Sequence, residues 1–234
     1  MTEVNCAKCP RPVCNSPAWE EGPDNCPTKI KKGLIKRATE KCFSEELQEF
    51  ARQASIQEGQ GYAKVPFAPK GYSPIKSRLE EIVEFAIKMG YKKLGVAFCG
   101  GVTYEAGLLV PILENKGFEV VSVCCKCGSV PKEDLGIRDD EKVAPGRFEA
   151  MCHPIAQADI LNDAHTDLNI MLCLCVGHDS LFLKQSQAPC TVFAVKDRVF
   201  GHNPVVALYQ SKSYYRRILA KEIIPVTSTE LKRL

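Results

Sequence analysis

Four short apolar runs in the second half of the chain constrain its fold most strongly. They cover residues 93–98, 119–125, 168–175 and 190–195. Segments with helical periodicity lie around them, at about 74–89, 104–116, 154–162, 180–187 and 204–219. Near-continuous apolar strands that alternate with helices are typical of a parallel sheet covered on both faces. The pattern predicts an α/β domain over residues 74–234, with a doubly wound, mostly parallel sheet.

Length and charge limit the number of cores and the kinds of partner. The 234 residues suffice for one principal core with a small appendage. The 31 basic and 28 acidic residues are spread along the chain, so nucleic acid is not an expected partner. There is no run of 18 apolar residues for a membrane span, and the first residues lack the pattern of a secretory signal. We expect a cytoplasmic protein that binds no membrane.

The chain has 13 cysteines, and in a reducing compartment these indicate metal ligation, sulfur chemistry or buried packing. Four of them lie among prolines in the first 27 residues: Cys6, Cys9, Cys14 and Cys26. This segment has too few apolar residues to build a core, and a metal would supply the missing folding energy. We expect residues 1–27 to be a cysteine-rich module that binds zinc or an iron–sulfur cluster. The alternative is a tail with incidental cysteines.

Residues 28–73 are predicted to form a helical connector and a loop. Apolar residues recur at three- and four-residue steps from Thr28 to about Ile56, which indicates one helix, or two joined near Phe43 and Ser44. Ser44 is expected to cap the second helix, and Gly59 and Gly61 to end it.

The remaining cysteines fall mostly at the carboxyl ends of the predicted strands, or just before a helix in the case of Cys152. Because these ends gather at one edge of a parallel sheet, thiols from distant segments can share a metal there. Side-chain alternation would put Cys125 and Cys127 on one face. We expect a converging set of Cys99, Cys125, Cys152 and Cys175, with Cys127 as a further candidate. Cys124, Cys173 and Cys190 are expected in the core.

Polar residues follow the third and fourth strands at the same edge. They are His178, Asp179, Lys196, Asp197, Arg198 and His202. Beside a thiol cluster, such residues favour acid/base chemistry and anion binding, and Lys126 and Lys132 would add positive charge. Asp179 is expected to cap the helix that begins at Ser180. The glycines of FCGGVTYEAG allow backbone N–H groups to approach a ligand, but they lack the spacing of a nucleotide-binding loop.

Several of these segments resemble a known family. AFCGG followed by EAG, GFEVVSVCCK, CHPIAQADILN and LCVGHDSLFLKQSQAPCTVFAVKDRVFGHNPVVALY are similar to the DUF1847 family of cysteine-rich proteins from bacteria and archaea, largely anaerobes. The resemblance covers nearly the whole chain. It implies metal binding but fixes neither the metal nor a reaction. The family pattern usually has Asn where this chain has His153, so no role is carried over to His153.

Two functions of different classes are consistent with these residues. The first is an enzyme with an iron–sulfur cluster of 4Fe-4S composition, in which three cysteine ligands leave one iron open to a small anionic or thiolated substrate. Cys99 would then act as nucleophile or sulfur carrier in a desulfuration or elimination. The partner of the protein would be an electron donor or a second copy of the chain. The second is a non-catalytic protein that stores, transfers or senses metal. A third reading has only structural zinc at the N-terminus.

Overall fold

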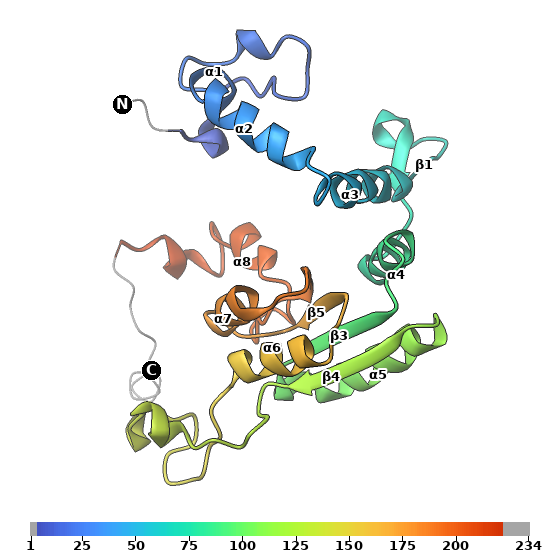
Figure 1. The fold of residues 1–234 in the computed structure, drawn as a ribbon. Helices are drawn as coiled ribbons and strands as arrows, with labels where there is room; N and C mark the ends of the chain where they lie inside the picture. The colour runs from blue at the N-terminus through green and yellow to red at the C-terminus, as the bar shows by residue number, and fades with distance from the viewer. Residues whose placement is uncertain (1–3, 222–234) are drawn as a thin grey trace. The chain divides into compact units, whose positions relative to one another are not determined.

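The computed structural model describes residues 4–221 (Figure 1). The chain divides into two units, and the boundary in the sequence lies between Lys76 and Ser77. Each unit is described by itself. None of the helices in the described range has the length and apolarity needed to cross a membrane.

The first residues of the N-terminal unit contain little regular structure. They form two short 3₁₀ turns, η1 (Cys6–Lys8) and η2 (Trp19–Glu21). Polar contacts hold them: the Lys29 ammonium donates to the Gly22 carbonyl at 3.0 Å, and the Lys32 ammonium lies 5.4 Å from the centre of the Trp19 ring. Among the described residues up to Lys76, Cys26 is the only apolar side chain that is buried. As the composition predicts, this segment has no apolar core.

Three helices and a hairpin complete the N-terminal unit. The helices are α1 (Pro27–Ile30), α2 (Lys32–Cys42) and α3 (Gln48–Gln60), and the break between α2 and α3 confirms the predicted junction near Phe43. The predicted Ser44 cap is wrong: α3 begins four residues later, after Leu47, and has no side-chain cap. The predicted loop contains an antiparallel hairpin of β1 (Tyr62–Lys64) and β2 (Tyr72–Pro74).

The second unit is the predicted α/β domain. Its strands are β3 (Lys93–Phe98), β4 (Glu119–Cys124), β5 (Leu168–Leu172) and β6 (Cys190–Ala194), all parallel, in the order β4-β3-β5-β6. Its helices are α4 (Arg78–Lys88), α5 (Thr103–Asn115), α6 (Pro154–Asp163), α7 (His178–Gln185) and α8 (Val205–Tyr209), followed by the turn η7 (Arg216–Leu219). Helix α4 begins later than predicted because Pro74 belongs to β2 and the capping box of Ser77 and Glu80 sets the start.

The strand order reverses direction between β3 and β5. The chain passes from β3 to β4 through α5, and then returns across β3 to β5 through α6. Since such crossovers are right-handed, α5 and α6 cover opposite faces of the sheet, and Figure 1 shows α6 and α7 together on the side away from α5. In open α/β sheets, ligands bind beyond the carboxyl ends of the strands at such a reversal. Cys99 and Cys173 directly follow the two central strands there.

The two central strands form the middle of the core, since every residue from Leu94 to Phe98 and from Leu168 to Leu172 is buried. Gly95 allows their close approach: a Cβ at Gly95 would lie 2.0 Å from Asn169 Oδ1. At the carboxyl end, the buried Gln157 amide of α6 donates to the carbonyls of Phe98 at 3.1 Å and Val123 at 2.7 Å. These bonds tie α6 to the ends of β3 and β4.

The long connection between β4 and α6 is held by ion pairs. It contains the turns η5 (Lys132–Leu135) and η6 (Asp139–Glu141). Glu149 accepts from the Lys132 ammonium and from the Ala144 N–H, both at 2.5 Å, and the buried Lys142 ammonium pairs with Asp139 at 3.1 Å. Lys132 is therefore engaged within this loop.

Candidate functional site

The residues that follow β3, β4 and β5 remain tied to the sheet through their backbones. The Cys99 N–H donates to the Leu172 carbonyl at 3.1 Å, and the Cys125 N–H donates to the Phe98 carbonyl at 2.8 Å. The Cys173 N–H likewise donates to the Ala194 carbonyl at 2.8 Å. Cysteines that come after different strands are therefore brought to one edge.

Three thiols form a hydrogen-bonded chain at this edge. Cys125 is the central member and contacts both Cys99 and Cys152; we call these three residues the thiol chain. The Gly100 N–H also donates to Cys125 Sγ, at 3.3 Å. Cys152 comes from the long loop, which is fixed here because the His153 N–H donates to the Cys125 carbonyl at 2.8 Å. The chain thus joins three separate loops.

The thiol chain contains two anionic sulfurs and a neutral one. The hydrogen bond with Cys125 lowers the pKa of Cys99 to about 4 against the effect of burial, and the Gly101 N–H and the Lys196 ammonium add to the shift. The same partner lowers the pKa of Cys152 to about 5, assisted by Lys126 and His178. The bonds to Cys152 and Cys99, together with burial, raise the pKa of Cys125 far above its usual range. Near neutral pH, Cys125 is therefore the protonated member of the thiol chain.

Three cations lie beside sulfurs at this edge: two beside the thiol chain and one beside Cys175. Lys196 bonds to Cys99, and Lys126 bonds to Cys152 while also donating to the Ala150 carbonyl at 2.5 Å. Arg198 Nη2 donates to Cys175 Sγ at 3.1 Å, and this bond is the main reason that the pKa of Arg198 is raised. The cations balance part of the negative charge at the edge.

Gly101 leaves room between two of these groups. A Cβ at Gly101 would lie 3.4 Å from Lys196 Nζ and 3.8 Å from Cys99 Sγ. An alanine at this position would therefore make ordinary van der Waals contacts with both groups.

Other cysteines near the edge take no part in the thiol chain. The strand ends at Cys124, and a turn closes with the Cys127 N–H donating to the Cys124 carbonyl at 3.1 Å. Side-chain alternation does not continue through a turn, so Cys127 has Cys124 as its neighbour rather than sharing a face with Cys125. Burial raises the pKa of Cys127 and of Cys173, and Cys173 is only 2% exposed. Cys190 packs against the core.

Three of the polar residues predicted for the site instead brace its loops. Asp179 Oδ1 accepts from the N–H groups of Gly177 at 2.9 Å and Ser180 at 2.7 Å. Because α7 already begins at His178, the prediction that Asp179 caps this helix is wrong. Asp197 Oδ1 accepts from the N–H groups of residues 199 and 200, and His202 Nδ1 accepts from the Asp197 N–H at 3.2 Å. His178 differs, since its charge acts on Cys152.

The sequence reasoning did not single out Gln157. Its side chain is fully buried, and its Oε1 has no hydrogen-bond partner among the described residues. The available signal was one amide side chain on an otherwise apolar helix face in PIAQADIL.

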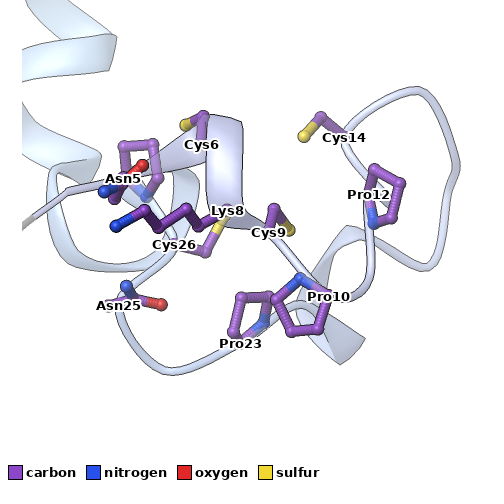
Figure 2. A pocket seen from close by; sticks show the side chains of 11 residues that line it. Asn5, Cys6, Lys8, Cys9, Pro10, Pro12, Cys14, Pro23, Asn25 and Cys26 are labelled. Carbon is purple, nitrogen blue, oxygen red and sulfur yellow. The ribbon is translucent and has the colours of Figure 1, made fainter. Parts of the chain in front are cut away.

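The four N-terminal cysteines surround a separate cavity of about 350 Å³ (Figure 2). Figure 2 shows the Cys14 sulfur turned toward the turn that carries Cys6 and Cys9, and several prolines complete the wall. Cys6 and Cys14 are exposed, whereas Cys26 is buried. A hydrogen bond with the Thr28 side chain lowers the pKa of Cys26.

Neither the thiol chain nor the set of four N-terminal cysteines has the geometry of a metal site in this structure. Within residues 4–221, no group of three or more His, Cys, Asp or Glu side chains is arranged to hold a metal ion. The chemistry of the donors is nevertheless that of a site for thiophilic metals, because thiolates select zinc, copper(I) and iron–sulfur clusters.

The chain is a cysteine-rich α/β protein: its sheet is parallel, and several of its cysteines lie at the edge of the sheet where the strand order reverses. The chain belongs to the family described as "Protein of unknown function (DUF1847)", whose model matches residues 26–193. An uncharacterized protein of Methanocaldococcus jannaschii, MJ0455, is 41% identical over 216 residues, covering 92% of this chain and 98% of the relative. The family match confirms the resemblance and includes the whole thiol chain.

Proposed function

We propose that the thiol chain binds a thiophilic metal centre and that the protein is an enzyme acting on a small anionic or sulfur-containing molecule. The observation that carries the proposal is the convergence of three thiols from separate loops, with Cys125 hydrogen-bonded to both Cys99 and Cys152, at the carboxyl edge of the parallel sheet.

The electrostatics of the thiol chain support metal binding. Metal ligation requires thiolates, and Cys99 and Cys152 are already anionic near neutral pH. Grouping two negative sulfurs in a largely buried place is unfavourable unless cations compensate them. Lys196 and Lys126 supply part of this compensation, and a metal ion would supply the rest.

The contacts within the chain bear on the kind of metal centre. Two thiolates on one tetrahedral zinc ion, with bonds of ~2.3 Å, lie about 3.8 Å apart, so the three thiols would have to rearrange around a single ion. The cysteines of an iron–sulfur cluster bind different irons and lie farther apart. An iron–sulfur cluster, the centre expected from the sequence, would need the loop of Cys152 to move outward. With three protein ligands, either centre retains an open position.

The residues around the open side favour an anionic substrate. Lys196 lies beside Cys99, and Arg198 lies beside Cys175. The N–H groups of Gly100 and Gly101 donate to the sulfurs of Cys125 and Cys99. A bound metal would supply Lewis acidity toward a substrate sulfur or oxygen. Lys196 would hold the anionic group, and His178, which acts on Cys152, is placed to exchange a proton. Desulfuration or elimination is the reaction class that uses these groups together.

The second candidate function is non-catalytic storage, transfer or redox sensing of a metal. The observation that favours it is the N-terminal cavity, where the exposed Cys6 and Cys14 give a metal an open route in and out. In that case the N-terminal cysteines hold zinc or a second cluster, and the thiol chain holds the exchangeable metal.

The first test is metal and acid-labile sulfide analysis of the full chain purified without oxygen. Cys125→Ala should remove the metal of the thiol chain, whereas Cys190→Ala, at a packed thiol outside the chain, should retain it. A Cys6→Ser/Cys9→Ser variant separates the N-terminal cysteines. If Cys125→Ala keeps all its metal and the double variant loses all of it, the thiol chain is not a metal site.

Turnover distinguishes the enzyme from the storage protein. For an enzyme, Lys196→Met should keep its metal but lose sulfide release from thiolated anions. No sulfide release by the wild-type protein over a broad panel of such substrates, with metal bound, would favour the non-catalytic function.

A further inference from the structure

We infer that Cys175, held by Arg198, is the thiol that accepts sulfur from the substrate, and that the substrate is a small anionic donor of sulfane sulfur such as an organic persulfide or thiosulfate. The inference rests on the proposed function and deepens it. It also transfers the role of sulfur carrier from Cys99, which the thiol chain already engages.

Cys175 is an accessible thiol of the site. It is partly exposed, as Cys152 is, whereas Cys99 and Cys125 are 8% and 3% exposed. Its loop faces solvent, since the neighbouring Val176 is 91% exposed. The loop is nevertheless ordered around its carbonyl, which accepts from the N–H groups of His178 and Asp179, both at 3.0 Å. A reagent from solvent therefore reaches Cys175 more readily than it reaches Cys99 or Cys125.

Arg198 is fixed beside this thiol and keeps most of its donors for a ligand. Its Nη2 lies 3.1 Å from Cys175 Sγ, and no Asp or Glu in the described part of the chain forms an ion pair with it. A guanidinium has five N–H donors, so further donors are available for an anionic group. The loop is braced on either side of Arg198 by the contacts of Asp197 with residues 199, 200 and 202.

The reaction at Cys175 needs no oxidant or reductant. The Cys175 sulfur attacks the outer sulfur of a donor R–S–S⁻, and a new S–S bond forms between them. The S–S bond of the donor breaks, and its electron pair leaves with R–S⁻, which takes up the proton of the Cys175 thiol. Cys175 then carries the persulfide, and R–SH departs; with thiosulfate, the same S–S bond breaks and hydrogen sulfite departs with the electron pair and the proton. Arg198 holds the anionic donor beside the attacking sulfur and stabilises the negative charge during transfer.

The test is peptide mass spectrometry of the full chain after incubation without oxygen with thiosulfate, and separately with glutathione persulfide. We expect one added sulfur atom on the peptide that contains Cys175. It should be absent from Cys175→Ser and present in Cys42→Ser, a control at a partly exposed thiol outside the site. Arg198→Met retains the thiol and should lower the labelling rate roughly tenfold, the effect of losing one charge-assisted hydrogen bond, while Arg198→Lys recovers part of it.

Two results would overturn the inference: no added sulfur with either donor, or added sulfur on Cys99 or Cys152 that persists unchanged in Cys175→Ser. Metal content measured on the same samples separates the two proposals. Bound metal without labelling of Cys175 overturns the inference alone. Labelling of Cys175 in a protein that binds no metal supports the inference and overturns the metal centre.

Discussion

At the scale of single residues, Cys125 controls the charge of the site. Its hydrogen bonds are the largest cause of the lowered pKa values of both Cys99 and Cys152. The cations beside those two thiols make smaller contributions. One neutral thiol therefore sets the charge of two others.

We predict that Cys125→Ala raises the pKa of both neighbouring thiols in the metal-free, reduced protein. The measurement is thiolate absorbance at about pH 6, roughly two units below the ordinary thiol pKa of ~8.5. The wild-type protein should show the absorbance of both thiolates, and Cys125→Ala should lose most of it. Cys190→Ala should match the wild type. Equal absorbance in Cys125→Ala and the wild type would contradict the hydrogen-bonded chain.

Strand ends could be located from the sequence, but turns beyond them could not. The strand-end rule groups Cys99 with Cys125, and Cys152 was added because it lies just before a helix; in the structure Cys125 interacts with both of the others. The rule also groups Cys175 with them, although Arg198 is the partner that the structure gives Cys175. The Cys127 prediction depended on alternation that stops at Cys124, and hydrogen bonds made by Asp179, Asp197 and His202 to nearby N–H groups leave no periodic trace in a sequence.

At the scale of elements, the close packing of β3 on β5 depends on Gly95. A Cβ there would overlap Asn169 Oδ1 and approach Leu161 to 2.9 Å. Asn169 cannot turn away without losing its bonds to Thr166 and Ser186, both at 2.8 Å.

We predict that Gly95→Ala lowers the free energy of unfolding by about 1–3 kcal/mol or more, because the core must shift to admit a methyl group. Gly107→Ala is the matched control: no atom lies within 4 Å of its added Cβ, and alanine favours helix α5 by up to about 1 kcal/mol. Chemical denaturation of both variants measures the difference. Equal stability of the two would show that the strands have room to spare.

The stability of the loop before Cys152 should depend on pH, because Glu149 holds this loop through its carboxylate. Its bonds to Lys132 and the Ala144 N–H lower the pKa of its carboxyl group. A carboxylate with a lowered pKa stabilises the fold above its unfolded-state pKa of ~4.3, and this contribution is lost as the pH falls through the lower folded-state value.

We therefore predict that Glu149→Gln makes the loop at neutral pH resemble the wild-type loop at acid pH. Tryptic cleavage at Lys132, Arg138, Lys142 and Arg147 measures this opening and should become faster in the variant. Glu58→Gln, at an exposed position of α3, should cleave like the wild type. Unchanged cleavage in Glu149→Gln would show that the other ion pairs hold the loop.

Elements were predictable where periodicity extended over many residues. The four strands of the parallel sheet and the helices between them lie within a few residues of their predicted positions. The hairpin of β1 and β2 was missed because three-residue strands are too short to show alternation. Ser44 was chosen as a cap by residue type, but its carbonyl, not its side chain, accepts the N–H groups of Leu47 and Gln48.

At the scale of the whole molecule, the two units differ in what stabilises them. The α/β unit has a continuous apolar core, whereas the described part of the N-terminal unit buries one apolar side chain, Cys26. Folding energy for the first 27 residues must come from polar contacts or from a metal held by the cysteines.

We predict that a chelator changes the fluorescence of Trp19, the only tryptophan in the chain, while far-ultraviolet circular dichroism stays nearly constant. The reason is that metal loss should loosen η2 and its contact with Lys32 but leave the α/β core intact. Cys6→Ser/Cys9→Ser should show the altered emission even with metal present, and Cys42→Ser should not. Emission that is indifferent to chelator would mean that no metal stabilises this segment.

The backbone bonds of Cys99, Cys125 and Cys173 have a consequence for how long the site stays assembled. Reactive groups on loops are usually exposed by local opening, which costs far less than global unfolding. Here each cysteine extends a strand ladder, so its amide is released only when the neighbouring strand is released too. The positions of Cys99 and Cys125 then last as long as the sheet itself, whereas that of Cys152 depends on its loop and on the bond from the His153 N–H to the Cys125 carbonyl.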